Sequence, residues 1–519
     1  MESNSALSQQ LQRLRTESTP DEVFAFLEEN IERIFSTPDV YQAYQVLQEL
    51  DVDRSPRLLA KLIVAWMAFL CGDNARLSAL LAGVREAELD TPQVSSLFYA
   101  LKALVSGMMA GGEAERYAQL ALDILPANEV SIYMANAQLT YGQILAGREQ
   151  YHRAAEMFSA AQGNFQQRRM PFPAMIALVN ELLNRFHLGE VADVVDKCNQ
   201  ALLMSASYQR RTGDYWDVVH LPLGMCYYQL HRPHLAIDHL QKCITAVNRL
   251  QLLHLHGLIE VYLFKSLFLA RDQEGMCKLT AEAIAQFGHL NYPQMDQLLS
   301  VFRILSAPEL TDELQLDVER LELCYQEALQ DGFSLVPEAL VWLRLKGQSQ
   351  LVQPGDLLPR LKRFRFIGNI PQVQLTELQL AELYLQAGQS RQASRHLQAA
   401  VQIYREYGIS ACFGSLPLGS AEMILRLDSE LYHRILQVQA TALAEARSAQ
   451  GSAEAVLSPR EREIVQLMAA GKSNQEISQE LFISVGTIKW HINRIFSKLQ
   501  AKNRVQAIEK AKALREIVV

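Results

Sequence analysis

The amino-acid sequence predicts an all-α protein, in which a long array of helical repeats is followed by a small four-helix domain. Three observations predict this architecture. Apolar residues recur at helical spacing through almost the whole chain, and no long stretch alternates apolar and polar residues as a strand would. A pattern of small and apolar residues returns about every forty residues between positions 142 and 400. Residues 457–519 carry four closely spaced helix-start signals and a net positive charge.

The size and composition are those of an ordinary globular protein. The chain has 519 residues, of which 49% are hydrophobic and 20% charged, so it is long enough for several domains or one repeat array with a large core. Residues 1–19 form a polar segment without the basic and apolar regions of a signal peptide. The longest apolar stretch, residues 58–71, contains Lys61 and is too short to cross a bilayer. We therefore expect a cytoplasmic protein without a membrane partner.

The repeat pattern is clearest around Gly142. Leu145, Ala154, Phe158 and Ala161 follow it at offsets of 3, 12, 16 and 19. A small residue on a first helix and an alanine on a second let two antiparallel helices approach closely, while the larger side chains fill the groove between them. The same offsets recur, in full or in part, from four further starting residues, here called anchors: Leu182, Gly224, Phe264 and Ala381. From Gly142 to Phe264, successive anchors are 40, 42 and 40 residues apart. The last gap, from Phe264 to Ala381, is 117 residues, which is three further units.

These offsets resemble the tetratricopeptide (TPR) repeat, although the period near forty is longer than the usual unit. Upstream, Ser55–Trp66 followed by Gly72 and by Ala79–Leu81 predicts another hairpin of this class. We therefore predict a TPR-like array over residues 20–427. Such units stack into a superhelix with a concave surface, which we expect to bind a small-molecule or protein effector. Residues 428–456 would connect the array to the C-terminal domain, through a helix to Arg447 and a short flexible linker at 448–456.

The C-terminal domain begins with two capped helices. Ser458–Glu461 combines an N-cap serine, a proline at the first helical position and a glutamate three residues on, which is a capping box. Ser473–Glu476 is a second capping box, after a first helix that ends at Gly471. The inward positions of these two helices are Ile464, Val465, Leu467, Met468, Ile477 and Leu481.

A third helix follows a connection of three residues, Phe482 to Ser484, and a fourth begins at Asn503–Gln506. A short helix, a tight connection and a helix with a polar outer face form the helix-turn-helix plan, whose second helix enters the major groove of DNA. The apolar positions of the third helix are Ile488, Ile492, Ile495, Phe496 and Leu499. Its outward residues are Thr487, Lys489, Trp490, His491, Asn493, Arg494 and Lys498.

Charge separates the C-terminal domain from the rest of the chain. Residues 457–519 contain eleven lysines and arginines and six glutamates, a net charge of +5, whereas the whole chain carries −8. The remainder therefore carries −13. A basic domain attached to an acidic remainder indicates that the domain binds nucleic acid and that the rest of the chain has another function.

Five motifs of the domain together resemble the LuxR-type (GerE-like) DNA-binding domain. The resemblance implies base-facing roles for Lys489, Trp490 and Asn493, although Trp490 replaces a smaller residue common at that place. It also implies backbone or mixed contacts for Thr487, His491, Lys498 and Arg504. The motifs are Leu457-Ser-Pro-Arg-Glu-x-Glu463, Gly471-Lys-Ser-Asn-Gln-Glu-Ile477, Ser484-x-x-Thr-Ile-Lys-x-His491, Lys498-Leu499 and Arg504-x-Gln-Ala507.

A homodimer on double-stranded promoter DNA is the assembly that this family resemblance implies, with the fourth helix (Arg504 to about Arg515) as a dimer contact. The overall layout resembles the C-terminal half of the large MalT-like activators. Because these families usually activate transcription, we expect an activator that works with RNA polymerase. MalT-like activators also carry a nucleotide-binding module, but Gly471-Lys-Ser473 has Gln466 where such a motif needs its first glycine. An ATP-driven switch is not predicted.

Catalytic, cofactor and metal sites are not predicted either. Six histidines lie between His220 and His256, and a metal could bind near His231 and His234, but exposed or capping histidines on repeat helices are favoured. The seven cysteines are scattered, without a Cys-x-x-Cys motif, and are expected to be buried reduced thiols. The basic run at 360–365 is expected to be a solvated helix face rather than a contact to DNA or an acidic partner. The competing class is a TPR-like interaction scaffold whose C-terminal domain serves for docking.

Overall fold

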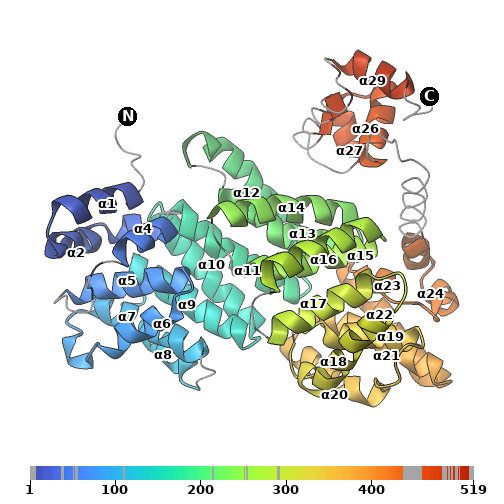
Figure 1. Ribbon diagram of the computed structural model, residues 1–519, viewed down its shortest axis with the longest axis horizontal. Helices are drawn as coiled ribbons and strands as arrows, with labels where there is room; N and C mark the ends of the chain where they lie inside the picture. The colour runs from blue at the N-terminus through green and yellow to red at the C-terminus, as the bar shows by residue number, and fades with distance from the viewer. Residues whose placement is uncertain are drawn as a thin grey trace. The chain divides into compact units, whose positions relative to one another are not determined.

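The computed structural model consists of helices joined by short connections (Figure 1). Contacts divide the chain into two compact units, residues 1–435 and 436–519. Every regular element of the described residues is an α-helix or a 3-10 helix, so the predicted all-α fold is confirmed. The structure describes the chain except for residues 1–6, 37–39, 49, 51, 53–56, 109–111, 213–214, 251, 253–254, 289–292, 333, 437–458, 482–487, 489–490, 493–494, 497–498, 500, 502 and 514–519.

The first unit begins with four short helices: α1 (Leu7–Glu17), α2 (Pro20–Glu29), α3 (Ile31–Ser36) and α4 (Val40–Leu47). Helix α1 lies in a segment that the sequence analysis treats only as polar. Its residues Leu7 and Leu11 are one turn apart and fully buried, and α1 packs against α4 and α2. Two leucines at helical spacing are enough to join this helix to the core, so the array begins before residue 20.

Nine helical hairpins follow within the described residues, and consecutive helices pack against one another except α19 and α20, which contact α18 and α21 instead. The hairpin predicted upstream of residue 81 is present as α5 and α6, and the three units predicted after Phe264 begin at α17, α19 and α21. The hairpins are α5 (Leu58–Leu70) and α6 (Asn74–Ala82), α7 (Pro92–Met108) and α8 (Ala114–Asp123), α9 (Ile132–Gly147) and α10 (Tyr151–Gln167), α11 (Pro171–His187) and α12 (Val191–Thr212), α13 (His220–Gln229) and α14 (Pro233–Leu250), α15 (His256–Leu269) and α16 (Gln273–Phe287), α17 (Pro293–Ser306) and α18 (Asp312–Ala328), α19 (Val336–Leu345) and α20 (Pro354–Ile367), and α21 (Ile370–Gln386) and α22 (Ser390–Tyr407).

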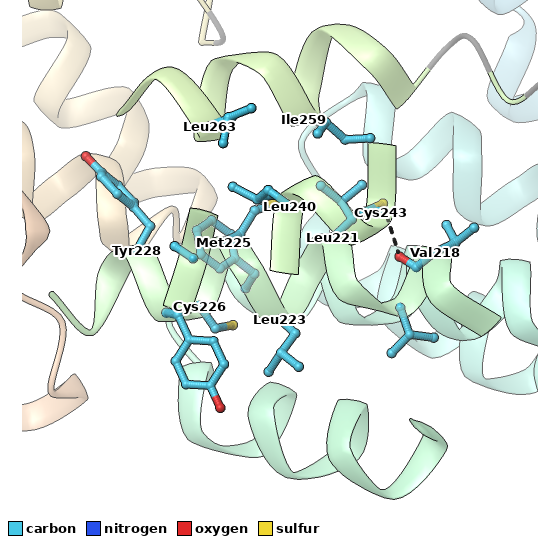
Figure 2. Packing of buried hydrophobic residues seen from close by; sticks show 14 of the residues in the cluster. Val218, Leu221, Leu223, Met225, Cys226, Tyr228, Leu240, Cys243, Ile259 and Leu263 are labelled. Carbon is cyan, nitrogen blue, oxygen red and sulfur yellow. Dashed lines mark hydrogen bonds between the residues drawn. The ribbon is translucent and has the colours of Figure 1, made fainter. Parts of the chain in front are cut away.

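The close approach within a hairpin occurs where the repeat pattern predicts it. A Cβ atom on Gly142 would lie 2.7 Å from the ring of Phe158, and one on Gly224 would lie 2.7 Å from Leu240 Cγ. Both partners stand sixteen residues after their glycine and are fully buried. Figure 2 shows Leu240 and Cys243 of α14 among apolar side chains of α13 and α15. The predicted role of the small residues is therefore confirmed.

In the five hairpins that carry the anchors 142, 182, 224, 264 and 381, a residue in the left-handed region stands seven positions after the anchor. Three of these residues are not glycine: Glu149 (φ 59°), His231 (φ 58°) and Arg271 (φ 57°). Gly189 (φ 80°) and Gly388 (φ 73°) occupy the same place in other hairpins. The backbone turn repeats while the residue type changes, so this feature of the repeat is not visible in the sequence.

The last hairpins of the array contact the turns of earlier hairpins. The Arg363 guanidinium of α20 pairs with Glu149, in the α9–α10 turn, at 2.7 Å. After α22, the Ser410 N–H donates to the Gln229 carbonyl oxygen at the end of α13, at 2.8 Å. These contacts join residues about two hundred positions apart, and they place α20 to α23 (Ala411–Ser415) against the central hairpins.

The array continues past its predicted end at residue 427. After α24 (Ala421–Leu427), residues 429–436 are helical, and Leu431 and Ile435 are buried in the same cluster as Leu397 of α22. The helix predicted at 428–447 is thus present in part and belongs to the array core. Residues 437–447 and the predicted linker at 448–456 lie outside the described residues.

The second unit contains α26 (Pro459–Ala469), α27 (Asn474–Glu480) and α29 (Arg504–Ala513), and residues 488, 491–492 and 495–496 are also helical. Helix α26 packs against both α27 and α29. This unit has its own apolar core, formed by Ile464, Val465, Met468, Ile477, Leu481, Ile488, Ile492, Ile495, Leu499, Ala507 and Ala511. None of the described helices, in either unit, combines the length and the apolarity that crossing a bilayer requires.

Candidate nucleic-acid interface and array cavity

The turn between α26 and α27 has the predicted geometry. Gly471 ends α26 with a φ of +82°, which an L side chain rarely adopts. The Ser473 N–H then donates to Glu476 Oε2 at 2.7 Å, and the Glu476 N–H donates to Ser473 Oγ at 3.3 Å. The hydrogen bond from the Ser473 N–H to the carboxylate, followed by the Ser473 hydroxyl, lowers the pKa of Glu476. The second capping box is confirmed, whereas Ser458 of the first box lies outside the described residues.

The apolar face of the predicted third helix lies in the core of the domain. Ile488 and Ile495 are fully buried, and Ile492 and Leu499 are nearly so. Phe496 is partly buried beside them. The spacing of four, three and four residues between the buried positions is that of one helix face. The inward face predicted from the sequence is therefore confirmed.

Two of the eight predicted DNA-contacting residues, His491 and Arg504, are among the described residues. His491 is half-buried. Because the structure does not describe the other six, their contacts with DNA stay predictions. These six are Thr487, Lys489, Trp490, Asn493, Arg494 and Lys498.

Arg504, the first residue of α29, has a role within the domain. Its guanidinium donates to the carbonyl oxygens of Met468, at 3.2 Å, and of Lys472, and it also approaches Asn474 Oδ1 at 3.4 Å. The last carbonyl groups of a helix lack partners within it, and a cation is favourable at that negative end. Partial burial lowers the pKa of Arg504. Arg504 thus ties the α26–α27 turn to α29, a role that the family motif alone does not indicate.

The start of α29 is capped by Asn503, whose Oδ1 accepts a hydrogen bond from the Gln506 N–H at 2.9 Å. Ala507 and Ala511 face the core and are fully buried. Val505 lies on another side of the helix and is 66% exposed. This helix therefore presents an apolar side chain outside the domain core.

The first unit contains a partly open cavity of about 550 Å³ among its central and later hairpins. Its wall comes from α11, α13, α15, α17, α19, α21 and α23, so first helices of successive hairpins contribute most of it. The lining is mostly apolar and aromatic, as is usual for small-molecule sites of this size. Aromatic side chains in the wall are Phe186, Tyr228, Tyr262, Phe264, Phe268 and Trp342.

One ion pair lines the cavity. The Lys265 ammonium of α15 donates to the Glu338 carboxylate of α19 at 2.9 Å, and both side chains are mostly buried. The pair connects helices 73 residues apart in the sequence. Because the two charges compensate each other, the pair adds no net charge to the wall.

The histidines between 220 and 256 lie deeper than the sequence suggests. His220 Nδ1 and His239 Nδ1 are 2.9 Å apart, and burial lowers the pKa of both residues to about 3. His231 and His256 are each 3% exposed, so the expected exposed positions are wrong for them. His231 is buried because α23 covers its turn, where Gly414 lies beside its ring. The described residues hold no group of three or more His, Cys, Asp or Glu side chains that would suit a metal ion.

The basic run at 360–365 is a solvated helix face in part, since Lys362 and Arg365 are exposed, but Arg360 and Arg363 are not. Arg360 is 5% exposed and donates to backbone carbonyl oxygens in the α18–α19 connection, at residues 328–331. Arg363 pairs with Glu149, as described above. Buried backbone carbonyl groups need donors, and arginine can supply several at once. These side chains therefore hold the array together.

Comparison with known proteins identifies the C-terminal domain. Residues 455–511 match the family described as bacterial regulatory proteins, luxR family. These residues therefore form a LuxR-family helix-turn-helix domain, as the sequence motifs predict.

Curated relatives share this domain. Transcriptional regulatory protein DesR of Bacillus subtilis is 46% identical over 56 residues, which are 11% of this chain and 28% of the relative. Transcriptional regulatory protein LiaR of the same organism is 53% identical over 51 residues, 10% of this chain and 24% of the relative. HTH-type transcriptional regulator AlkS of Alcanivorax borkumensis is 32% identical over 69 residues, 13% of this chain and 8% of the relative. The chain thus spans about a quarter of the length of the first relatives it matches.

The array has a more distant counterpart. A crystal structure of a Rap protein complexed with competence and sporulation factor aligns with 68% of this chain and 98% of its own, at 11% identity and a TM-score of 0.48. At this score the alignment adds nothing to the assignment of the fold. The helical-repeat architecture rests on the hairpins themselves and on their recurring close approach.

Proposed function

We propose that this protein is a transcriptional regulator whose C-terminal domain binds promoter DNA in a sequence-specific manner. The observation that carries the proposal is the match of residues 455–511 to the luxR family, on a unit with its own core and its own helix caps. A domain built in this way can present a helix to the major groove without help from the array.

The residues proposed to contact DNA are those that the sequence pattern assigns to the outer face of the third helix. Lys489, Trp490 and Asn493 would contact base edges, and Thr487, His491, Arg494 and Lys498 would contact the backbone or both. Burial of Ile488 and Ile492 supports this assignment, because a helix that buries these positions has its opposite face available. Arg504 would add a phosphate contact to its structural role, since its guanidinium has five donor hydrogens.

We further propose that the protein binds DNA as a homodimer through α29. Exposed Val505 supports a contact there, because it is an apolar side chain outside the domain core. Replacing Val505 by aspartate should weaken dimer formation on DNA while leaving the buried Ala507 and Ala511 in place. Mass photometry of the DNA complex would measure this, and an unchanged proportion of dimer would contradict the contact.

In this proposal the array is the sensory part. The cavity in the first unit supports an effector site there. The opposite net charges support the assignment of DNA binding to the basic C-terminal domain and of effector binding to the acidic array. The regulator would act as an activator together with RNA polymerase, in the cytoplasm and without catalysis of its own. The competing function is an interaction scaffold whose C-terminal domain serves for docking. The repeat array would favour this function if the protein did not bind DNA.

Selection of genomic fragments by the purified full-length protein tests the proposal. We expect enriched fragments to share an inverted repeat, because a two-fold dimer binds two half-sites. Lys489→Ala should weaken binding to those fragments by roughly 1–3 kcal/mol if it contacts a base. Lys278→Ala removes the same charge from an exposed position on α16 and should leave the selection unchanged. Enrichment of unrelated fragments, or none, would overturn sequence-specific binding.

A further inference from the structure

The array cavity offers a ligand an apolar wall with few charges. Lys265 is the one lysine or arginine among the described residues that line it, and Glu338 already compensates its charge. His187 also lines the cavity, and burial lowers its pKa to about 4, so the side chain is neutral near pH 7. The cavity therefore lacks the cations that a phosphate group or a polycarboxylate would need.

The other polar side chains of the wall are mainly carboxamides. Six of the lining residues are glutamine or asparagine, and they come from α13, α17, α21 and the connection before α21. A carboxamide both donates and accepts hydrogen bonds, and the peptide group has the same two capacities. The six are Gln229, Gln294, Gln297, Asn369, Gln372 and Gln379.

Gln379 is the most informative of these residues. It is 3% exposed, yet its Nε2 group has no hydrogen-bond partner among the described residues. An amide donor without a partner at such a buried place is unfavourable, and a carbonyl oxygen from a ligand would remove that cost. The buried amide thus indicates a ligand that has carbonyl groups and an otherwise mostly apolar surface.

We infer that the cavity binds a short apolar peptide, with its side chains against the aromatic and aliphatic wall and its backbone against the carboxamides. This inference rests on the proposed function, because it names the effector class for the proposed sensory array. Neutral sugars also donate and accept hydrogen bonds, but they would leave most of the aliphatic wall without an apolar partner. A volume of about 550 Å³ suits a ligand of a few residues rather than a folded partner.

The cavity also touches α23, which precedes the last helices of the first unit. Cys412 and Ser415 of α23 line it, and so does Leu416 directly after that helix. Helix α23 is held by the Ser410–Gln229 hydrogen bond and by a bond of 3.1 Å from the Arg271 guanidinium to the Gly414 carbonyl oxygen. A peptide in the cavity would therefore contact an element close in sequence to the end of the array at residue 435. Ligand binding at this position could change the conformation of the segment that precedes the DNA-binding unit in the sequence, as a sensor requires.

The test uses the full-length protein and three defined mixtures of probes. The first contains pentapeptides of Ala, Val, Leu and Phe, the second contains the same peptides with Asp at alternate positions, and the third contains neutral oligosaccharides. Mass spectrometry after size-exclusion chromatography identifies retained molecules, and the thermal midpoint of the protein is measured with each mixture. We expect retention of apolar pentapeptides and a higher midpoint, because a ligand that binds only the folded state stabilises it.

Two variants and one control make this test specific. Gln379→Leu should reduce peptide retention about tenfold without lowering the thermal midpoint of the free protein, since the replaced amide donor has no partner. Ala339→Trp should fill the cavity and abolish retention. Gln402→Leu changes an exposed glutamine of α22 and should retain peptides like the parent protein.

Three outcomes would overturn the inference: no retention of apolar pentapeptides, equal retention by Gln379→Leu, or preference for the acidic peptides or the oligosaccharides. The same preparations are used for the selection of genomic fragments. Failure of peptide binding with intact DNA selection would refute the peptide site alone, whereas failure of DNA selection with intact peptide binding would refute the proposed regulator.

Discussion

The helical array and the C-terminal domain both join helices by tight turns, but they build those turns differently. In the array, the turn residue has the same left-handed backbone in successive hairpins while its type changes from Glu149 to His231 to Arg271. In the domain, a glycine is followed by a serine–glutamate capping box, and Arg504 binds the carbonyl groups of the turn. Side-chain caps occur in both parts, since Asp272 Oδ1 in the array accepts from the Gly275 N–H at 2.9 Å. An arginine of a later helix reaches a turn in both parts as well: Arg363 pairs with the Glu149 side chain in the array, whereas Arg504 binds backbone carbonyl groups in the domain.

The two parts therefore depend on different interactions for their stability. A hairpin of the array depends on close approach and on buried groups that stay neutral, so a single misplaced atom or proton should have a large effect. The domain depends on several separate caps around a small core, and each cap contributes about 1 kcal/mol.

Acid should unfold the array before the C-terminal domain. Burial lowers the pKa of His187 and His231 to about 4, and that of His220 and His239 to about 3. Below pH 6.5 the unfolded chain binds protons that the folded array excludes. Stability is therefore complete above pH 6.5 and falls as the pH drops toward 4, by up to about 1.4 kcal/mol per pH unit and histidine.

Urea unfolding at pH 7 and pH 5, followed by circular dichroism, measures this loss. The C-terminal unit contains a single histidine, His491, so its unfolding should depend less on pH in this range. His239→Gln should reduce the pH dependence, whereas His152→Gln changes an exposed histidine and should not. Equal stability at both pH values would contradict the role of the buried histidines.

Adding one methyl group at a close approach should destabilise the array. Gly142→Ala places a Cβ atom 2.7 Å from the fully buried ring of Phe158, which is closer than such atoms pack, so the ring must shift. We expect a loss of about 1–3 kcal/mol in the free energy of unfolding. The matched control is Gly163→Ala on α10, where a Cβ atom would meet nothing within 4 Å. This control should gain about 0.5–1 kcal/mol, because alanine favours a helix interior over glycine.

Loss of Arg504 should weaken the domain even without DNA. Arg504→Ala removes the donors to Met468 and Lys472, and we expect a loss of about 1–2 kcal/mol in the stability of the C-terminal unit. Thermal unfolding of the free protein measures it. If Arg504 contacted only phosphate, the midpoint would be unchanged and the salt slope of DNA binding would fall by about 0.9.

The smallest effect is expected at the capping box of α27. Ser473→Ala should cost about 1 kcal/mol, because Glu476 N–H then loses its acceptor. Ser473→Gly should cost only a few tenths of a kcal/mol, since glycine is tolerated at an N-cap. Identical losses in the two variants would show that the box does not stabilise the domain.

The sequence predicted the helical class, the repeat offsets and the inward face of the C-terminal domain, because these depend on residue type and spacing. Glycine at 142 and 224 marks a close approach whatever surrounds it. The cavity was beyond prediction, since its lining brings together residues from Phe186 to Leu416 that are far apart in the sequence. For the same reason, the buried positions of Arg360 and Arg363 within the basic run could not be predicted, because their partners are distant in the sequence.

Within the candidate interface, the capping box of α27 and the buried isoleucines followed directly from local patterns. The structural role of Arg504 could not be predicted, because its acceptors are backbone carbonyl groups. Every residue has such a group, so the sequence does not mark which ones accept. The left-handed turn residues were hidden for a similar reason, since glutamate, histidine and arginine share no side-chain property that favours this backbone.

The most direct test of the account is the affinity of the full-length protein for an enriched genomic fragment and for a scrambled fragment of equal length, measured across salt concentrations. A sequence-specific regulator should prefer the enriched fragment by at least about 10³-fold at physiological salt, and its affinity for both should fall with added salt. Equal affinity for the two fragments at every salt concentration would contradict the central claim.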